Sequence, residues 1–274
     1  MSSNPVVFYH IPKSAGTTLN SILQKNYPPE NLVECGINTQ EFMADLKTWP
    51  PERLAQIRLL QGHFPFGIHE LLPGRPQFFT ILRDPVERVI SYYHHARREP
   101  AHYLHNLIHD NNWTLMDLLE SRLPLMMNDA QVRLISGAFE SPPFGEVDNG
   151  DLERAVANLR TFEVVGLTEE FDLALLLLQR AFGWRHIGYR PINVGDDRRR
   201  TEARAAETLS TIRRYNRLDA VLYEEARRLL AEQAAAAGPM LRPRLWAFRL
   251  GNRLAGLRYL PVRSILRQRL TKGR

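Results

Sequence analysis

Short apolar runs separated by turn residues give the first picture of this chain. Four such runs are compact, rich in β-branched or aromatic side chains, and followed by a turn signal, which predicts buried strands. They span residues 6–11, 58–62, 78–82 and 162–166. Helical spacing comes next: after the first run, Leu19, Ile22 and Leu23 fall on one face. Strands that alternate with helices predict an α/β fold, with a central parallel sheet flanked by helices.

Longer helical patterns dominate the second half and predict a helical carboxy-terminal part. They cover residues 115–135, 173–182 and 202–237. Pro124 is the point at which the first would break. Surface loops are predicted over residues 140–150 and 190–197. An alanine run closed by Gly238 and Pro239 indicates the end of the main domain, so we expect a domain over residues 1–238 and a basic tail over 239–274.

The segment between the first strand and its helix has the composition of a phosphate-binding loop. It reads His10-Ile11-Pro12-Lys13-Ser14-Ala15-Gly16-Thr17-Thr18. Backbone N–H groups at a helix start favour an anion, and small side chains let the phosphate approach closely. A lysine charge and two threonine hydroxyls add to this. The lysine comes three residues before the glycine, so this is not a Walker A motif. A plain strand-to-helix turn is the alternative.

A second candidate phosphate contact follows the third strand. Asp84 is a predicted helix N-cap, with Pro85 at the first helical position and Glu87 three residues after the cap. Arg83 therefore lies at the carboxyl end of a strand, where open parallel sheets bind ligands, and Ser91 lies two turns further on. An arginine fork suits a phosphate dianion. The alternative is a surface ion pair between Arg83 and a neighbouring acid.

Together the two segments, HIPKSAGTTL and LRDPVERVISYY, resemble sulfotransferase family 2. This group contains PAPS-dependent, carbohydrate-type enzymes, heparan sulfate 2-O-sulfotransferase and bacterial relatives among them; PAPS is 3′-phosphoadenosine-5′-phosphosulfate. The similarity covers roughly residues 5–230. It continues through Gln61-Gly62-His63, residues 128–137, 165–169 and 216–223, and Asn193.

The resemblance implies a P-loop-like sulfotransferase fold that binds PAPS and releases PAP. It places the 5′-phosphosulfate on Lys13, Ser14, Ala15, Gly16, Thr17 and Thr18. It places the 3′-phosphate on Arg83 and Ser91, and a loop with Arg198, Arg199 and Arg200 over the nucleotide. It further implies an acceptor hydroxyl, on a glycan or glycolipid, although a small metabolite fits the sequence equally well.

Sulfuryl transfer needs a base for the acceptor hydroxyl and positive charge for the departing phosphate. Lys13 suits the second task. His63 ends the second strand at the same edge of the sheet and is our candidate base. Some relatives carry a second histidine two residues earlier, where this chain has Gln61, which takes no proton.

Composition indicates the cellular compartment in which we expect the protein. The 274 residues are 44% hydrophobic and 24% charged, as in globular proteins, and Cys35 is the single cysteine, so no internal disulfide forms. The amino terminus lacks the pattern of a signal peptide, and no apolar stretch approaches the roughly 18 residues of a membrane span. We therefore expect a cytoplasmic enzyme. The sequence gives no indication of oligomeric state.

The net charge of +6 is concentrated in the tail. Residues 239–274 hold ten Lys or Arg and no acid, which leaves 26 basic against 30 acidic residues elsewhere, a charge of −4. We therefore expect no nucleic-acid partner. In the tail, apolar residues recur at helical spacing: Leu241, Leu245, Phe248, Leu250, Leu254 and Leu257. Two interpretations stay open, a helix that binds anionic lipid at the inner membrane face and a helix packed on the domain.

Other classes of function are less favoured. A histidine cluster at positions 94, 95, 102, 105 and 109 lacks an HExxH motif, so no metal is expected. A nucleotide kinase needs a Walker lysine and a Mg²⁺-binding acid that the sequence does not show. A nucleotide-binding protein without chemistry is the remaining alternative.

Overall fold

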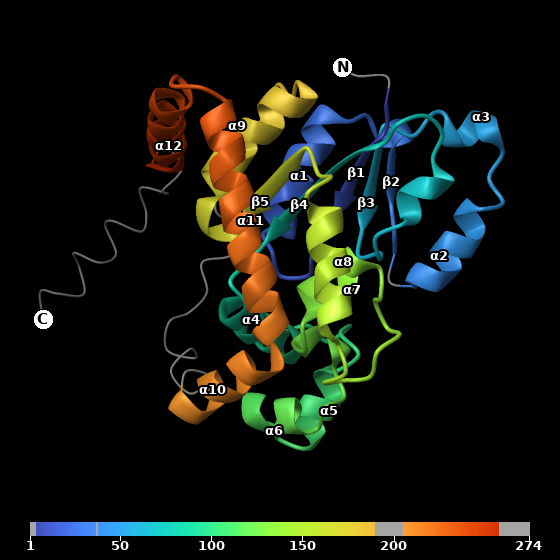
Figure 1. Ribbon diagram of the computed structural model, residues 1–274, viewed down its shortest axis with the longest axis vertical. Coiled ribbons are helices and arrows are strands. Elements are labelled where there is room, and N and C mark those ends of the chain that lie inside the picture. Colours follow the sequence, from blue (N-terminus) through green and yellow to red (C-terminus); the bar gives the residue numbers. More distant parts are fainter. Residues whose placement is uncertain (1–3, 37, 190–204, 258–274) are drawn as a thin grey trace, which may run out of the picture.

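The computed structural model describes residues 4–36, 38–189 and 205–257 (Figure 1). At its centre lies a five-stranded sheet in the order β2-β3-β1-β4-β5, and all four strand pairs are parallel. The strands are β1 (Val6–Tyr9), β2 (Leu32–Glu34), β3 (Leu59–Gly62), β4 (Gln77–Leu82) and β5 (Val164–Leu167). The predicted α/β class and parallel sheet are confirmed, and β2 is a short strand that the sequence analysis missed.

Helices cover both faces of the sheet (Figure 1). Those of the first half are α1 (Gly16–Asn26), α2 (Thr39–Leu46), α3 (Pro51–Leu54), α4 (Pro85–Arg98), α5 (His105–Asp110) and α6 (Leu115–Glu120). Those of the second half are α7 (Ala130–Ser136), α8 (Asn149–Leu159), α9 (Phe171–Phe182), α10 (Ala206–Tyr215), α11 (Arg217–Ala236) and α12 (Leu241–Leu257). Short 3₁₀ turns lie at Pro29–Asn31, Ile68–Leu71, Leu125–Met127 and Thr168–Glu170.

Alternating side chains on the strands separate two aromatic layers. On one face, Phe79 stacks on Phe8 at 4.6 Å and contacts Phe182 of α9. On the other face, Tyr9 packs against Phe66 and Phe162. The sheet is therefore buried on both sides, as an all-parallel sheet requires.

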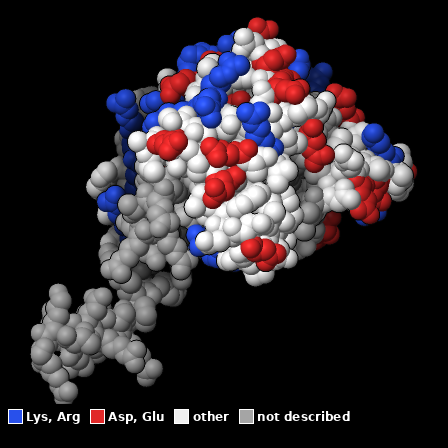
Figure 2. Space-filling view, turned by 90° about the horizontal axis from the view of Figure 1, so that it is seen from below, with Lys and Arg blue, Asp and Glu red and all other residues white. Residues whose placement is uncertain are grey.

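A second apolar cluster lies beyond the carboxyl ends of the strands, among α4, α5, α6 and α10. It contains Val89, Tyr93, Ile108, Leu118 and Ile212, all buried. Figure 2 views the molecule from below, the end at which these helices lie in Figure 1, and shows basic and acidic side chains interspersed with much uncharged surface.

Two predicted helices are divided. The pattern over residues 115–135 becomes α6, a 3₁₀ turn and α7, because Pro124 and the left-handed Asp129 (φ 44°) interrupt it. The pattern over residues 202–237 becomes α10 and α11, separated by Asn216. Asn216 is buried, and its side chain donates to the carbonyl oxygens of Met127 and Ile212. The contact with Met127 spans 89 residues, so hydrophobic periodicity did not reveal it.

Helix α12 starts beyond the predicted domain boundary and packs on α9. Leu241 is buried, and Leu245 and Phe248 lie against the main core. The Arg249 guanidinium pairs with Glu170 at 3.3 Å and with Asp172 at 3.4 Å. The boundary at residue 238 stays a prediction.

Candidate functional site

The loop between β1 and α1 has the backbone of an anion-binding nest. Lys13 (φ 70°) and Ala15 (φ 59°) are left-handed, and Ser14 between them is not. Such alternation turns successive N–H groups toward one concave side. The Ser14 N–H closes the loop by donating to the Ile11 carbonyl at 3.2 Å. Gly16 then begins α1, so the helix dipole also points into the loop.

The side chains of this loop supply further donors. Ser14 is fully buried, and its hydroxyl has no hydrogen-bond partner among the described residues. An unpaired buried hydroxyl is costly unless a ligand oxygen accepts from it. Thr17 and Thr18 lie in the first turn of α1, where the first is exposed and the second half-buried. The loop therefore fits a phosphate or sulfate group.

The two phosphate motifs meet in the structure. One terminal nitrogen of the Arg83 guanidinium donates to the Lys13 carbonyl at 3.0 Å, across 70 residues of sequence. Burial lowers the pKa of Lys13 to about 8, with Arg98 and Arg83 adding to the shift. This cluster of positive charge is poised to bind an anion.

Helix α4 begins as the sequence predicts. The Asp84 side chain accepts from the Glu87 N–H at 3.0 Å, and Pro85 is the first helical residue. Ser91 lies half-buried on this helix, two turns after Arg83.

The candidate base His63 lies beside the phosphate loop. Its Nδ1 is 2.7 Å from the His10 carbonyl oxygen, and the two imidazole rings are 4.2 Å apart. A carbonyl only accepts, so Nδ1 carries the proton and Nε2 keeps its lone pair. His63 is exposed as a residue, yet desolvation by the surrounding protein lowers the pKa of its imidazole. Both features favour a neutral imidazole that takes up a proton.

His10 is a site residue that the sequence analysis did not single out. Its ring stacks on Phe8 at 5.0 Å and lies between that ring and His63. Desolvation, with smaller contributions from His63 and Lys13, holds the pKa of His10 well below its usual value. The neutral ring therefore acts as packing between the phosphate loop and His63.

Two buried aspartates beneath the site were also missed. The Asp129 side chain accepts from the N–H groups of Leu218 and Asp219, at the start of α11. The Asp219 side chain accepts from the N–H groups of Gln131 and Val132, at the start of α7. Asp129, just before α7, thus caps α11, and Asp219, within α11, caps α7. The similarity over residues 128–137 and 216–223 was the sequence signal for this pair.

The remaining predicted residues differ in outcome. Arg198, Arg199 and Arg200 lie outside the described residues. Gln61 is buried, and neither atom of its amide has a hydrogen-bond partner within the described part of the chain.

Three of the five clustered histidines bond to the backbone. Ring nitrogens of His102, His105 and His109 contact Leu104 N, Ala96 O and Arg97 O. In the described ranges, no three His, Cys, Asp or Glu residues are grouped to hold a metal ion. The expectation of no metal stays a prediction.

A shallow depression of about 400 Å³ lies between the start of α2 and the segment 138–141. Its lining includes the apolar side chains of Met43, Pro65 and Phe139 and the polar side chains of Gln40 and Glu140. Thr39, which also lines it, donates from its hydroxyl to the His63 carbonyl at 3.2 Å. The depression is thus linked to the backbone of His63 through Thr39.

The parallel sheet, with an anion-binding loop after its central strand, is the arrangement of an α/β nucleotide-binding fold. A family model described as "Sulfotransferase family" matches residues 2–121, which is less than half of the chain. The matched residues contain both phosphate motifs and His63, and end before α7.

Comparison with individual proteins adds little detail. No curated protein matches the chain significantly. One similar solved structure is mouse sulfotransferase SULT7A1 complexed with PAP, with 14% identity and a TM-score of 0.36. The match covers 76% of this chain and 67% of that one.

Proposed function

We propose that the protein transfers the sulfuryl group of PAPS to a hydroxyl of a carbohydrate or glycoconjugate. The observation that carries the proposal is the contact between Arg83 and the Lys13 carbonyl, because it joins the two phosphate motifs in one site. The unpaired Ser14 hydroxyl in the nest supports the same assignment.

Each residue then has a role. The amides of residues 13–18, the hydroxyls of Ser14, Thr17 and Thr18, and the Lys13 ammonium hold the 5′-phosphosulfate. Arg83 and Ser91 hold the 3′-phosphate. Arg198, Arg199 and Arg200 cover the nucleotide, a role that rests on the family resemblance alone.

In the reaction, His63 Nε2 takes the proton of the acceptor hydroxyl as its oxygen attacks sulfur. The bond between sulfur and the 5′-phosphate oxygen breaks, and PAP leaves with the extra negative charge. Lys13 and the loop amides stabilise that charge. The proton stays on His63 until solvent removes it.

The depression whose lining residue Thr39 contacts the His63 backbone is the proposed acceptor site. Its mixture of apolar and polar lining residues suits a sugar ring, which has C–H faces and hydroxyls around its rim. Glu140 at this site disfavours a strongly anionic acceptor.

The cofactor assignment is tested by calorimetry with PAP and AMP, which differ in the 3′-phosphate. The protein should bind PAP more tightly, and Arg83→Ala should erase most of the difference, because a charge-assisted contact contributes about 1.5–3 kcal/mol. Equal affinities of the unmodified protein for PAP and AMP would refute the assignment. Labelled PAPS with a cell extract, followed by identification of the product, tests the acceptor class.

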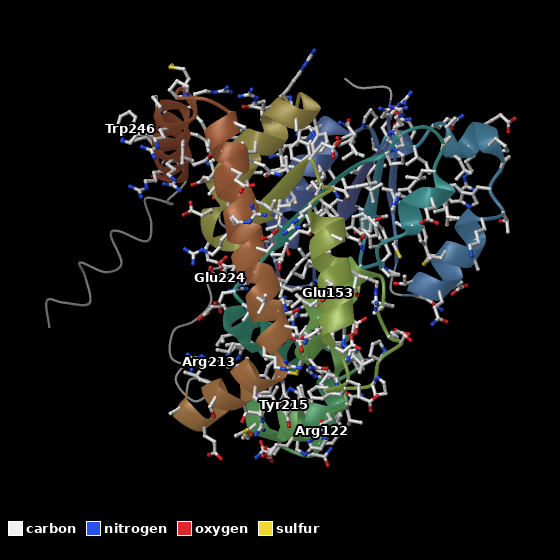
Figure 3. All side chains as sticks on the ribbon, viewed as in Figure 1. Arg122, Glu153, Arg213, Tyr215, Glu224 and Trp246 are labelled. Carbon is white, nitrogen blue, oxygen red and sulfur yellow. The ribbon has the colours of Figure 1, made fainter. Side chains whose placement is uncertain are left out.

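A peripheral site at the inner face of the membrane is also proposed, and it rests on α12. The face of this helix opposite the packed residues exposes Trp246 (69%), Leu250 (41%) and Leu254 (52%), with Arg242 and Arg253 exposed nearby. Trp246 points away from the body of the protein (Figure 3). An exposed apolar ridge beside basic side chains fits an anionic lipid surface. No helix within the described ranges is long and apolar enough to cross a membrane.

A further inference from the structure

The backbone of Arg83 is held by one side chain, that of Gln131. The Arg83 N–H donates to Oε1 of Gln131 at 3.0 Å, and Nε2 of Gln131 donates back to the Arg83 carbonyl at 3.0 Å. Gln131 is fully buried at the start of α7. Both backbone groups of Arg83 are therefore satisfied by a residue 48 positions away.

This pair of hydrogen bonds takes the place of strand pairing at Arg83. The ladder between β4 and β5 ends at Leu82, which pairs with Leu167, so Arg83 is the first residue beyond the sheet. A residue there needs an acceptor for its N–H and a donor for its carbonyl oxygen, and the Gln131 amide presents both in one plane. Gln131 thus continues the ladder by one residue and fixes the backbone from which the Arg83 side chain extends.

Gln131 is itself fixed. Its N–H donates to the Asp219 carboxylate at 3.2 Å, and Asp219 is fully buried at 3.9 Å from the Arg88 guanidinium. At the far end, the Arg83 guanidinium donates to the Lys13 carbonyl. A continuous chain of contacts therefore runs from the start of α11 through Gln131 and Arg83 to the phosphate loop.

We propose that Gln131 is a positioning residue that aims Arg83 at the 3′-phosphate and so sets the preference for a 3′-phosphorylated nucleotide. The inference rests on the proposed function of Arg83. Gln131 touches no nucleotide in this scheme: it acts by restricting the backbone of the residue that does.

The experiment compares PAP and AMP affinity by calorimetry in four proteins: unmodified, Gln131→Met, Arg83→Ala and Gln233→Met. Gln233 is a matched control because its amide also bridges backbone groups, accepting from Val165 N–H and donating to the Phe162 carbonyl. Methionine keeps the length of glutamine and removes both hydrogen bonds. We expect Gln131→Met to weaken PAP binding about 10-fold and leave AMP binding unchanged. The reason is that a displaced Arg83 guanidinium loses most of its charge-assisted contact with the 3′-phosphate, which AMP lacks. Gln233→Met should change neither.

The outcomes separate the inference from the proposed function. If the unmodified protein does not distinguish PAP from AMP, the assignment of Arg83 fails. If it does, and Arg83→Ala abolishes the distinction while folded Gln131→Met keeps it, the positioning role of Gln131 is wrong. Equal losses for PAP and AMP in Gln131→Met also overturn it, because they indicate general damage to the site.

A second variant covers the case in which Gln131→Met does not fold. In Gln131→Glu, the ionised carboxylate accepts from the Arg83 N–H but cannot donate to the Arg83 carbonyl, whereas the protonated acid does both. Its PAP affinity relative to the unmodified protein at the same pH should therefore recover as pH falls, while its relative AMP affinity stays flat. A pH-independent ratio for PAP contradicts the inference.

Discussion

The His10 ring occupies the space that a side chain at Gly16 would need. A methyl group on Gly16 would lie 1.9 Å from Nε2 of His10. The ring has little freedom to move aside, because it is stacked on Phe8 and lies 4.2 Å from the His63 ring. The first residue of α1 and the candidate base are thus linked through one imidazole.

The first prediction is that Gly16→Ala lowers turnover about 100-fold. The added methyl group displaces His10, and His63 moves with it. A shift of about 1 Å in a catalytic group can lower the rate about 100-fold. Steady-state kinetics with PAPS measures the effect. Gly36→Ala is the control, since nothing lies within 4 Å of a side chain there. Equal turnover of the two variants contradicts the link.

The second prediction separates binding from chemistry at His63. His63→Ala should keep its affinity for PAP and lose about 10²–10⁴-fold in turnover, the usual contribution of a general base. Calorimetry and single-turnover kinetics measure the two quantities. Gln61 accepts no proton and offers no replacement. Normal turnover in this variant would show that another residue is the base.

The third prediction concerns pH. The pKa of His63 is lowered, so kcat/KM should rise with pH through a value below 6.5 as the imidazole becomes neutral. The pKa of Lys13 is about 8, so kcat/KM should fall again as pH passes 8 and the ammonium loses its proton. In the pH profile of kcat, the fall on the alkaline side should lie at higher pH, because bound phosphate favours the charged form of Lys13. Lys13→Arg should remove that limb, since arginine stays charged. A limb that persists in this variant belongs to another group.

Sequence reasoning identified the parts of the site that are local in sequence. The phosphate loop, the start of α4 and the strand before His63 each follow from neighbouring residues, and the structure brings them to one edge of the sheet. Gln131, Asp129 and Asp219 were missed as functional candidates because their roles depend on partners 48–90 residues away. A single sequence carries no spacing rule for such contacts.

Sequence periodicity also did not show which apolar residues of α12 are covered. Helical spacing predicted an amphipathic helix with apolar residues from Leu241 to Leu257. The structure instead divides these residues between a packed side, with Leu241, Leu245 and Phe248, and an exposed side, with Leu250 and Leu254. Periodicity finds apolar residues on a helix, but the position of α9 decides which of them are covered.

The fourth prediction is that Asp219→Ala lowers the free energy of unfolding by about 3–5 kcal/mol, as expected when one partner of a buried ion pair is removed. It deprives α7 of two capping acceptors and leaves Arg88, which is fully buried, without that carboxylate. Denaturant unfolding measures the loss. Glu224→Ala is the control, because its contact with Arg227 lies at the surface and should contribute less than about 1 kcal/mol. Similar losses in the two variants would show that the buried pair contributes little.

The fifth prediction tests the membrane proposal without disturbing the packed face of α12. Trp246→Gln combined with Leu250→Gln should leave folding and PAP binding unchanged but abolish sedimentation with anionic vesicles. Salt should suppress sedimentation of the unmodified protein, because exposed charges are screened. Truncation at Gly238 is a poorer test, since it removes the cover that Leu241 and Phe248 give to α9. Failure of the unmodified protein to bind such vesicles at low salt contradicts the proposal.

The reciprocal capping by Asp129 and Asp219 bears on how the molecule assembles. The first turns of α7 and α11 each depend on a carboxylate from the other segment. The N–H groups at either helix start therefore lack their acceptor until both segments have folded against each other. The two should therefore open and close as one cooperative unit. Because Gln131 belongs to this unit, the backbone of Arg83 is supported only after residues far beyond the family-matched region, 2–121, have folded. The amino-terminal segment holds the candidate phosphate-binding residues, while the backbone position of Arg83 among them depends on residues from the rest of the chain.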